Sequence, residues 1–208
     1  MMPFDLWLPF TLASITLLLI PGPTVLLVLS YSLSQGRKVA LASAAGVALG
    51  DLVAMSLSLA GLGALVATSA TLFTLLKWIG AAYLLWLGIK LIRSGPGQEL
   101  QLPQAAMKAR GIFWHTALVT ALNPKSIGFF IAFVPQFMTP QSPLLPQCAI
   151  MIMTFVSLAA LNALAYALTA SHMRQLITKP KILLRITRCG GAALITMAAL
   201  TVTMRRLA

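Results

Sequence analysis

The chain alternates between long apolar segments and short polar ones. Six stretches consist mainly of hydrophobic residues, and most of them are followed by a polar or proline-rich turn. A helix needs about 20 apolar residues to cross a bilayer, and five of the six stretches are that long. The pattern therefore predicts an all-α polytopic membrane helix bundle of six transmembrane spans. These predicted spans cover residues 6–31, 39–66, 72–92, 112–137, 144–170 and 189–204.

The overall composition agrees with a membrane location. Of 208 residues, 59% are hydrophobic and only 9% are charged, whereas a soluble domain carries about 25% charged residues. We expect a single transmembrane domain over residues 1–208. No Lys or Arg precedes Arg37, so we expect no cleaved signal peptide. The sixth span is short, and it can lengthen by taking in Ile186 and Thr187 while Arg188 reaches out along its stem.

Two of the predicted spans contain helix breakers near their middle. Pro21-Gly22-Pro23 interrupts the first span, and Asn123-Pro124-Lys125 interrupts the fourth. Proline removes a backbone donor and breaks the helix, and the freed carbonyls find no water in hydrocarbon. A lone proline kink would shape only the packing. Paired breaks at the midplane indicate instead a binding site of the kind found in secondary transporters.

The basic residues predict the orientation of the bundle. Eleven of the fifteen lie in the connections between spans 1 and 2, 3 and 4, and 5 and 6. The positive-inside rule puts these connections in the cytoplasm and both termini outside it. The net charge of +12 is thus explained by orientation, and we expect no nucleic-acid partner. The eleven residues are Arg37, Lys38, Lys90, Arg93, Lys108, Arg110, Arg174, Lys179, Lys181, Arg185 and Arg188.

A weak internal repeat relates the two halves of the chain. Gly80-Ala81-Ala82 in the third span resembles Gly191-Ala192-Ala193 in the sixth, at an offset that also aligns Asp51 with Asn162. Small-residue segments can align by chance, so the matched breaks in the first span of each half weigh more. A three-span unit that occurs twice must be inverted. We expect repeat one over about residues 4–93 and repeat two over about residues 111–207.

Asp51 is the residue with the strongest chemical signal. It lies about 18 Å into its span, where a charge costs roughly 2.5–3.5 kcal/mol on insertion scales. It adjoins a stripe of small residues, including Gly46 and Gly50, that suits close helix packing, so it should point inward. It is either a titratable group in a substrate or proton path, or a structural acid that pairs with Lys125 near the middle of span four.

Other polar groups in the apolar spans complete the predicted site. Thr24 and Asn162 can bind substrate or can bond a neighbouring helix, and the second role is the commoner one. With three acidic residues in the whole chain, we expect no metal site and no cofactor, and the motifs of membrane hydrolases are absent. The predicted substrate and proton pathway comprises Pro21, Gly22, Pro23, Thr24, Asp51, Asn123, Pro124, Lys125 and Asn162.

Four motifs stand in the first four predicted spans. They are Pro21-Gly22-Pro23, Gly46-x-x-x-Gly50-Asp51, Lys77-Trp78-x-Gly80-Ala81-x-Tyr83-Leu84-x-Trp86-Leu87-Gly88, and Asn123-Pro124-Lys125 with Pro135-Gln136-Phe137. With these motifs in this order, the chain resembles the lysine exporter (LysE) family over nearly its whole length, and within it the homoserine/threonine-exporter branch. The resemblance implies a bacterial inner-membrane exporter of amino acids driven by the proton-motive force. The family often has Asn where this chain has Thr24.

Three hypotheses about the function therefore remain open. The first is a secondary transporter, not an enzyme, that exports a small amino acid or derivative. The second is an exporter of another small solute or a cation on the same fold, although the small number of acidic residues disfavours a cation. The third is a non-transporting membrane scaffold, which would need neither Asp51 nor paired breaks. The expected partners are the amino acid, protons and the lipid bilayer, and the sequence leaves a homo-oligomer open.

Overall fold

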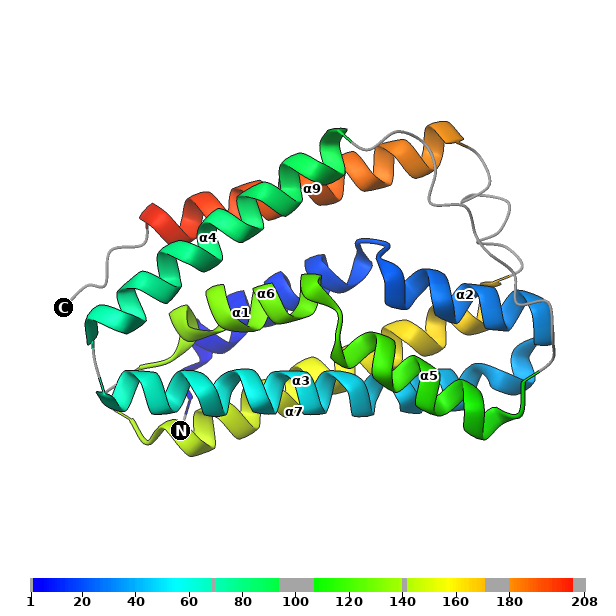
Figure 1. Ribbon diagram of the computed structural model, residues 1–208, viewed down its shortest axis with the longest axis horizontal. Helices are drawn as coiled ribbons and strands as arrows, with labels where there is room; N and C mark the ends of the chain where they lie inside the picture. The colour runs from blue at the N-terminus through cyan, green and yellow to red at the C-terminus, as the bar shows by residue number, and fades with distance from the viewer. Residues whose placement is uncertain (1, 69, 94–106, 140–141, 171–179, 204–208) are drawn as a thin grey trace.

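The structure is a computed structural model that describes residues 2–68, 70–93, 107–139, 142–170 and 180–203. Within these residues the chain forms helices joined by short turns and contains no β-strand, which confirms the all-α prediction there. The helices run roughly along one long axis (Figure 1). The start of the first helix and the end of the last lie at one end of the bundle, and the turn between α2 and α3 lies at the other (Figure 1).

Two bent helix pairs occupy the first and fourth predicted spans. In the first pair, α1 (Phe4–Leu19) and α2 (Pro23–Gln35) meet at 54°, and in the second, α5 (Ala109–Ala121) meets the segment Pro124–Phe137 at 45°. Each second helix begins with a proline, which suits the first helical position because its missing N–H would be unpaired there anyway. The second pair consists of α5, α6 (Pro124–Ala132) and a short 3-10 turn, η2 (Val134–Phe137).

Four longer helices complete the bundle. A turn with Gly36 at a φ of 74° and a 3-10 segment, η1 (Arg37–Val39), connect α2 to the first of them. Within the described residues, two helical stretches, Arg37–Gly61 and Leu144–Leu168, are each long and apolar enough to cross a membrane, and the count rises to four when each bent pair forms one span. The four longer helices are α3 (Ala40–Thr68), α4 (Ala70–Arg93), α7 (Leu144–Leu168) and α9 (Pro180–Thr203).

The last helix corrects the prediction for the sixth span. It begins at Pro180, nine residues before the expected start at residue 189. Arg185 and Arg188 therefore belong to the helix and not to a connecting loop, and both side chains are exposed. Long basic side chains can carry their charge away from an apolar helix surface along flexible stems. Residues 94–106 and 171–179, which include Glu99, Arg174 and Lys179, lie outside the described part of the chain.

Glycines set the close contacts between helices. A Cβ added to Gly46 or Gly50 of α3 would lie 2.5 Å from a backbone carbonyl oxygen of α5. The small-residue stripe of α3 therefore packs against α5, as the sequence predicts. Gly88 of α4 and Gly191 of α9 meet in the same way, since each added Cβ would lie within 2.7 Å of the other's carbonyl oxygen. These close approaches leave no room for a larger side chain.

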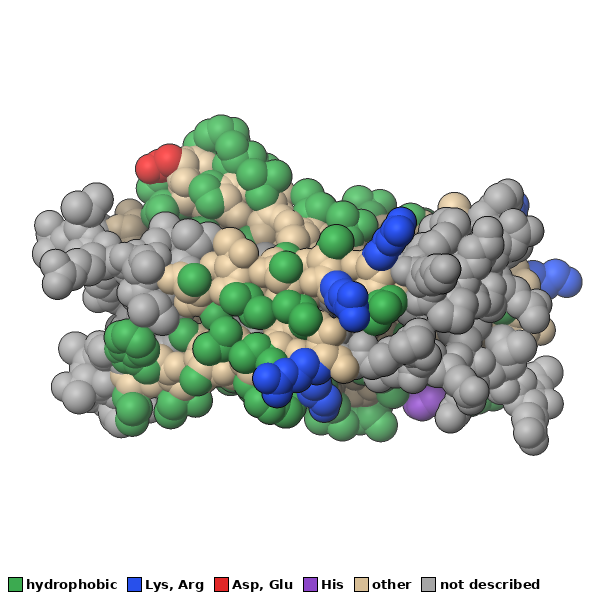
Figure 2. All heavy atoms as spheres, turned by 90° about the horizontal axis from the view of Figure 1, so that it is seen from above, with side chains coloured by type: hydrophobic (Ala, Val, Ile, Leu, Met, Phe, Trp, Pro, Cys, Tyr) green, Lys and Arg blue, Asp and Glu red, His purple; other side chains and the backbone are tan. Residues whose placement is uncertain are grey.

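The outside of the bundle is largely apolar. Leu41 and Leu57 of α3 and Leu145 and Met153 of α7 are more than 60% exposed. Soluble monomers rarely expose contiguous apolar surfaces of this kind, so the surface suits contact with lipid. On the face shown in Figure 2, the described Lys and Arg side chains lie from the middle of the molecule toward the end that carries the α2–α3 turn. Figure 2 shows none at the opposite end among the described side chains.

Candidate transport site

The break between α1 and α2 leaves backbone carbonyls without helical partners. In a continuous helix the N–H of residue 21 would donate to the carbonyl of Leu17, and that of residue 23 to Leu19. Pro21 and Pro23 have no N–H, so neither bond can form. The last carbonyls of a helix need partners from elsewhere when no water is present. The N–H of Ile20 donates to the carbonyl of Leu17 at 3.2 Å, and other elements supply the remaining donors.

Lys125 supplies side-chain donors to two carbonyls at the end of α1. Its ammonium donates to the carbonyl oxygens of Leu17 at 3.0 Å and Ile20 at 2.8 Å, across 108 and 105 residues of sequence. A cation at the C-terminal end of a helix is also stabilised by the helix dipole. Gly22 lies beside this ammonium, since a Cβ there would be in ordinary contact with Nζ at 3.4 Å. Lys125 is thus the cap of α1, although it belongs to α6.

Helix α7 supplies the other two donors. Asn162 Nδ2 donates to the carbonyl of Leu18 at 3.1 Å, and the hydroxyl of Tyr166 donates to the carbonyl of Leu19 at 3.2 Å. The two side chains are four residues apart and so lie on one face of α7. The carbonyls of residues 17–20 therefore each have a side-chain donor from the second half of the chain.

The second break is satisfied by its own residues. Pro124 frees the carbonyl of Thr120, and the N–H of Asn123 donates to it at 3.0 Å. The Asn123 side chain caps α6 by accepting from the N–H of Lys125 at 3.1 Å, as asparagine commonly does at a helix start. Its amide also donates to the hydroxyl of Thr24 at 3.2 Å. This last bond joins the second break to the first turn of α2.

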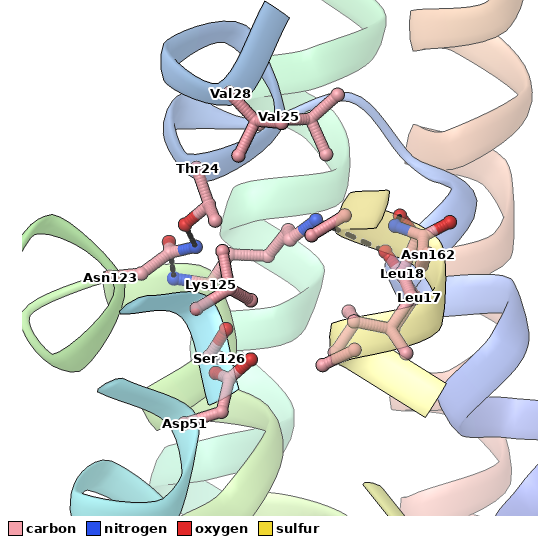
Figure 3. A pocket seen from close by; sticks show the side chains of 14 residues that line it. Leu17, Leu18, Thr24, Val25, Val28, Asp51, Asn123, Lys125, Ser126 and Asn162 are labelled. Atoms are coloured by element: carbon pink, nitrogen blue, oxygen red, sulfur yellow. Dashed lines mark hydrogen bonds between the residues drawn. The ribbon is translucent and has the colours of Figure 1, made fainter. Parts of the chain in front are cut away.

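A small cavity lies between the two breaks (Figure 3). Lys125 runs across it from α6 toward the end of α1, and Asp51 and Ser126 lie on one side of that stem (Figure 3). The cavity has a volume of about 30 Å³, which is space for a water molecule or two. It must enlarge before an amino acid can enter. It is lined by Leu17, Leu18, Gly22, Thr24, Val25, Val28, Val47, Asp51, Asn123, Lys125, Ser126, Ala159, Asn162 and Ala163.

Asp51 is buried at the wall formed by α3. Only 2% of the residue is exposed, and its Oδ1 atom has no hydrogen-bond partner. The direct ion pair with Lys125 that the sequence suggests does not form, because the ammonium is turned toward the carbonyls of Leu17 and Ile20. A buried carboxyl oxygen without a partner is costly. Asp51 is therefore available to a ligand or a proton that enters the cavity.

The structure brings most of the predicted pathway residues together. Six of the nine line the cavity, while Pro21, Pro23 and Pro124 form the breaks that create it. Tyr166 is not among the predicted pathway residues, yet it donates to a carbonyl of α1, and its four-residue spacing from Asn162 is a signal for this role. Among the described residues, no three His, Cys, Asp or Glu side chains are grouped to hold a metal ion.

Comparison with known proteins identifies the family. The model of the LysE type translocator family matches residues 15–205, which include both breaks and Asp51. The chain belongs to the LysE type translocator family. Members of this family are membrane transporters and not enzymes, and the break-lined cavity of this translocator fits that class. No solved structure matches the chain significantly.

Several relatives of this translocator are similar over most of their length. A protein of Vibrio cholerae named an uncharacterized membrane protein is 33% identical over 209 residues, which cover 98% of this chain and 100% of the relative. A homoserine/homoserine lactone efflux protein of Salmonella typhimurium is 34% identical over 98% of this chain and 99% of its own. A leucine efflux protein of Klebsiella pneumoniae is 35% identical over 63% of this chain and 62% of its own.

Proposed function

We propose that the protein exports a small, uncharged-side-chain amino acid or a derivative across the bacterial inner membrane. The observation that carries this proposal is the buried cavity in which Asp51, whose Oδ1 atom has no hydrogen-bond partner, lies opposite the start of α2. The similarity to homoserine/homoserine lactone and leucine efflux proteins supports the direction of transport and the substrate class.

The two sides of the cavity suit the two charges of an amino acid. The first turn of α2 has no side-chain cap, since Gly22 is its N-cap residue. The backbone N–H groups of Thr24 and Val25 have no acceptor within the helix, so they attract a carboxylate. The carboxyl group of Asp51 can accept the ammonium. A zwitterion thus bridges α2 and α3.

The rest of the cavity limits the side chain of the substrate. Its remaining wall includes Val25, Val28, Val47, Ala159 and Ala163. These residues favour a short apolar or hydroxyl-bearing side chain and offer no partner for a second charge. A side chain such as that of homoserine or leucine meets this requirement, whereas those of lysine and glutamate do not.

Proton coupling is the second element of the proposal. Of the three acidic residues in the sequence, Asp51 is the one placed in the apolar middle of a predicted span. Desolvation favours the neutral form of a carboxyl group in such a place, so Asp51 can take a proton from one side and release it to the other. Export driven by the proton-motive force needs such a group.

The proposed architecture is six spans in two inverted repeats with both termini outside the cytoplasm. The helix contacts support the repeat: α3 packs against α5 and α6 of the second half, and α7 packs against α1 and α2 of the first. The remaining long helices, α4 and α9, lie side by side (Figure 1). Each half thus places its unbroken second helix against the broken helix of the other.

Amino-acid release from loaded cells tests the function. Cells with and without the protein are loaded with dipeptides that yield leucine, threonine, lysine or glutamate, or are fed homoserine, and the amino acids in the medium are measured over time. The proposal predicts faster release of homoserine, threonine or leucine and unchanged release of lysine and glutamate. If each of these amino acids leaves the cells at the same rate with and without the protein, although the protein is present in the membrane, the proposal is overturned.

A further inference from the structure

In the described part of α2 and α3, three polar side-chain atoms beyond the cavity are buried without a hydrogen-bond partner. These atoms are Ser32 Oγ and Gln35 Nε2 in the last turn of α2, and Ser43 Oγ near the start of α3. Ser32 is 6% exposed and Ser43 is fully buried. Polar groups buried in proteins nearly always have a partner, and an apparent exception commonly marks a site of bound water.

On α2, these side chains continue the face that lines the cavity. Thr24 and Val28 line the cavity, and Ser32 follows at the same four-residue step, with Gln35 three residues further on. Residues three or four apart in a helix lie on one face. This face therefore changes from apolar at Val28 to polar at Ser32 and Gln35.

Helix α3 shows the same order of residues in the opposite chain direction. Asp51 and Val47 line the cavity, and Ser43 follows at the same four-residue step. Because a short turn joins α2 to α3 and the two helices contact each other, both faces lead from the cavity to the end that carries Arg37 and Lys38. The order on each helix is a polar group at the cavity, a valine, and then a serine.

Helix α7 provides a third wall without bulky side chains. Ala163 lines the cavity, Ala167 follows it on α7 toward the same end of the bundle, and Ala170 lies just beyond the end of α7; each is at most 4% exposed. The helix contacts both α2 and α3. Because alanine is small, this wall adds no bulky side chain beside Ser32 and Ser43.

The other side of the cavity is closed by aromatic rings. Phe129 and Phe130 of α6 are fully buried, and ring centroids lie 4.8 Å apart between Phe130 and Phe155 and 5.3 Å apart between Phe129 and Phe133. Ser14, which is also fully buried in this half, donates a hydrogen bond from its hydroxyl to the carbonyl of Phe10 in the same helix. This half presents packed rings and a serine with a hydrogen-bond acceptor, whereas the other presents the unpartnered atoms of Ser32, Gln35 and Ser43.

We propose that the transport path runs from the central cavity, between α2, α3 and α7, past Val28 and Val47, to a second polar layer formed by Ser32, Gln35 and Ser43. This layer holds water and passes the solute between the cavity and the cytoplasm, and the two valines form the constriction. Hydroxyl and amide groups both donate and accept hydrogen bonds, so they suit a zwitterion without trapping it. The solute and its direction rest on the proposed function.

Thiol labelling tests the path without any transport assay. In a background with Cys148→Ala and Cys189→Ala, single Ser32→Cys, Ser43→Cys and Ser14→Cys variants are exposed to a charged methanethiosulfonate in inverted membrane vesicles. Serine to cysteine changes one atom, and Ser14 matches Ser43 in burial. The expected result is labelling of Ser32→Cys and Ser43→Cys at least about tenfold faster than of Ser14→Cys, because a thiol reacts as the hydrated thiolate.

The outcomes separate this path from the proposed function. Equally slow labelling at all three positions would overturn the path even if amino-acid export is normal. Equally fast labelling at all three would also overturn it, since water would then enter the phenylalanine half too. Fast labelling at Ser32→Cys and Ser43→Cys, in a protein that releases no amino acid from loaded cells, would support the path and contradict the proposed function.

Discussion

Both helix breaks leave backbone carbonyls without helical partners, and the donors that bind these carbonyls differ in part between the two breaks. At the first, the carbonyl of Leu17 accepts from the N–H of Ile20 and from Lys125, and the carbonyl of Leu19 accepts from Tyr166. At the second, the carbonyl freed by Pro124 is served by the adjacent N–H of Asn123. Both breaks therefore use a neighbouring backbone N–H, but the first also needs side-chain donors to its carbonyls from the other half of the chain.

This difference indicates which side of the cavity can move. The second break is further fixed by the contact of Gly46 and Gly50 with the backbone of α5. The first is held by long side chains that can exchange one acceptor for another. A substrate carboxylate that reached Lys125 would compete with the carbonyls of Leu17 and Ile20, so binding and movement of α1 against α2 would be linked.

Removing the first break should have the largest effect. Replacing Pro21, Gly22 and Pro23 together by Ala restores the missing N–H groups and lets α1 and α2 continue as one helix. Amino-acid release from loaded cells should fall to background while the amount of protein in the membrane is unchanged. Full release by this variant would mean that the break only shapes packing.

Loss of the Lys125 cap should be nearly as severe. In Lys125→Met the stem is kept, but the carbonyl of Ile20 loses its donor, which costs about 1–3 kcal/mol. Export should fall by about tenfold or more, and Lys125→Gln, which keeps an N–H donor, should retain more activity. Export rates and thermal unfolding in detergent measure both effects. Equal activity of Lys125→Met and the unmodified protein would contradict the assigned role.

Crowding the second break should destabilise the bundle by a smaller amount. In Gly50→Ala the new Cβ would lie 2.5 Å from the carbonyl oxygen of Ala117 and 2.6 Å from Thr120 Cβ, and overpacking costs about 1–3 kcal/mol. Gly61→Ala is the matched control in the same helix, because its Cβ would meet nothing within 4 Å. Unfolding midpoints should fall for the first variant alone. Similar midpoints for both would refute a rigid α3–α5 contact.

The cap of α6 should contribute least. Asn123→Ala removes one capping bond and the bond to Thr24, and the loss of such a cap costs about 1 kcal/mol. Asn123→Ser keeps an uncharged capping oxygen and should recover most of that stability while losing the amide that donates to Thr24. Unfolding midpoints and export rates together separate the two bonds. An Asn123→Ala variant as stable as the unmodified protein would show that the second break needs no side-chain cap.

Local chemistry made part of this arrangement predictable. Proline and glycine determine where a helix breaks, whatever packs around it, so both breaks fall at the predicted residues. The four-residue spacing of Gly46 and Gly50 predicts close packing for α3, and the adjacent Asp51 is accordingly buried. These features depend on residues within one helix.

Other features depend on how distant helices meet. Lys125 bonds to carbonyls more than 100 residues away, and nothing near it in sequence distinguishes that partner from Asp51. The predicted start of α9 was wrong because Lys181, Arg185 and Arg188 suggest a loop. The exposed side chains of Arg185 and Arg188 are nevertheless compatible with a helix. Spacing alone does not choose between such alternatives.

The role of Asp51 is the central claim, and transport by Asp51→Asn in proteoliposomes tests it most directly. Asparagine keeps the shape of the side chain but cannot titrate, and Asp5→Asn, at the exposed start of α1, is the matched control. With a pH gradient imposed, we expect Asp51→Asn to lose uphill transport of its amino acid while downhill exchange persists, and Asp5→Asn to behave as the unmodified protein. Uphill transport by Asp51→Asn at the unmodified rate would contradict the account.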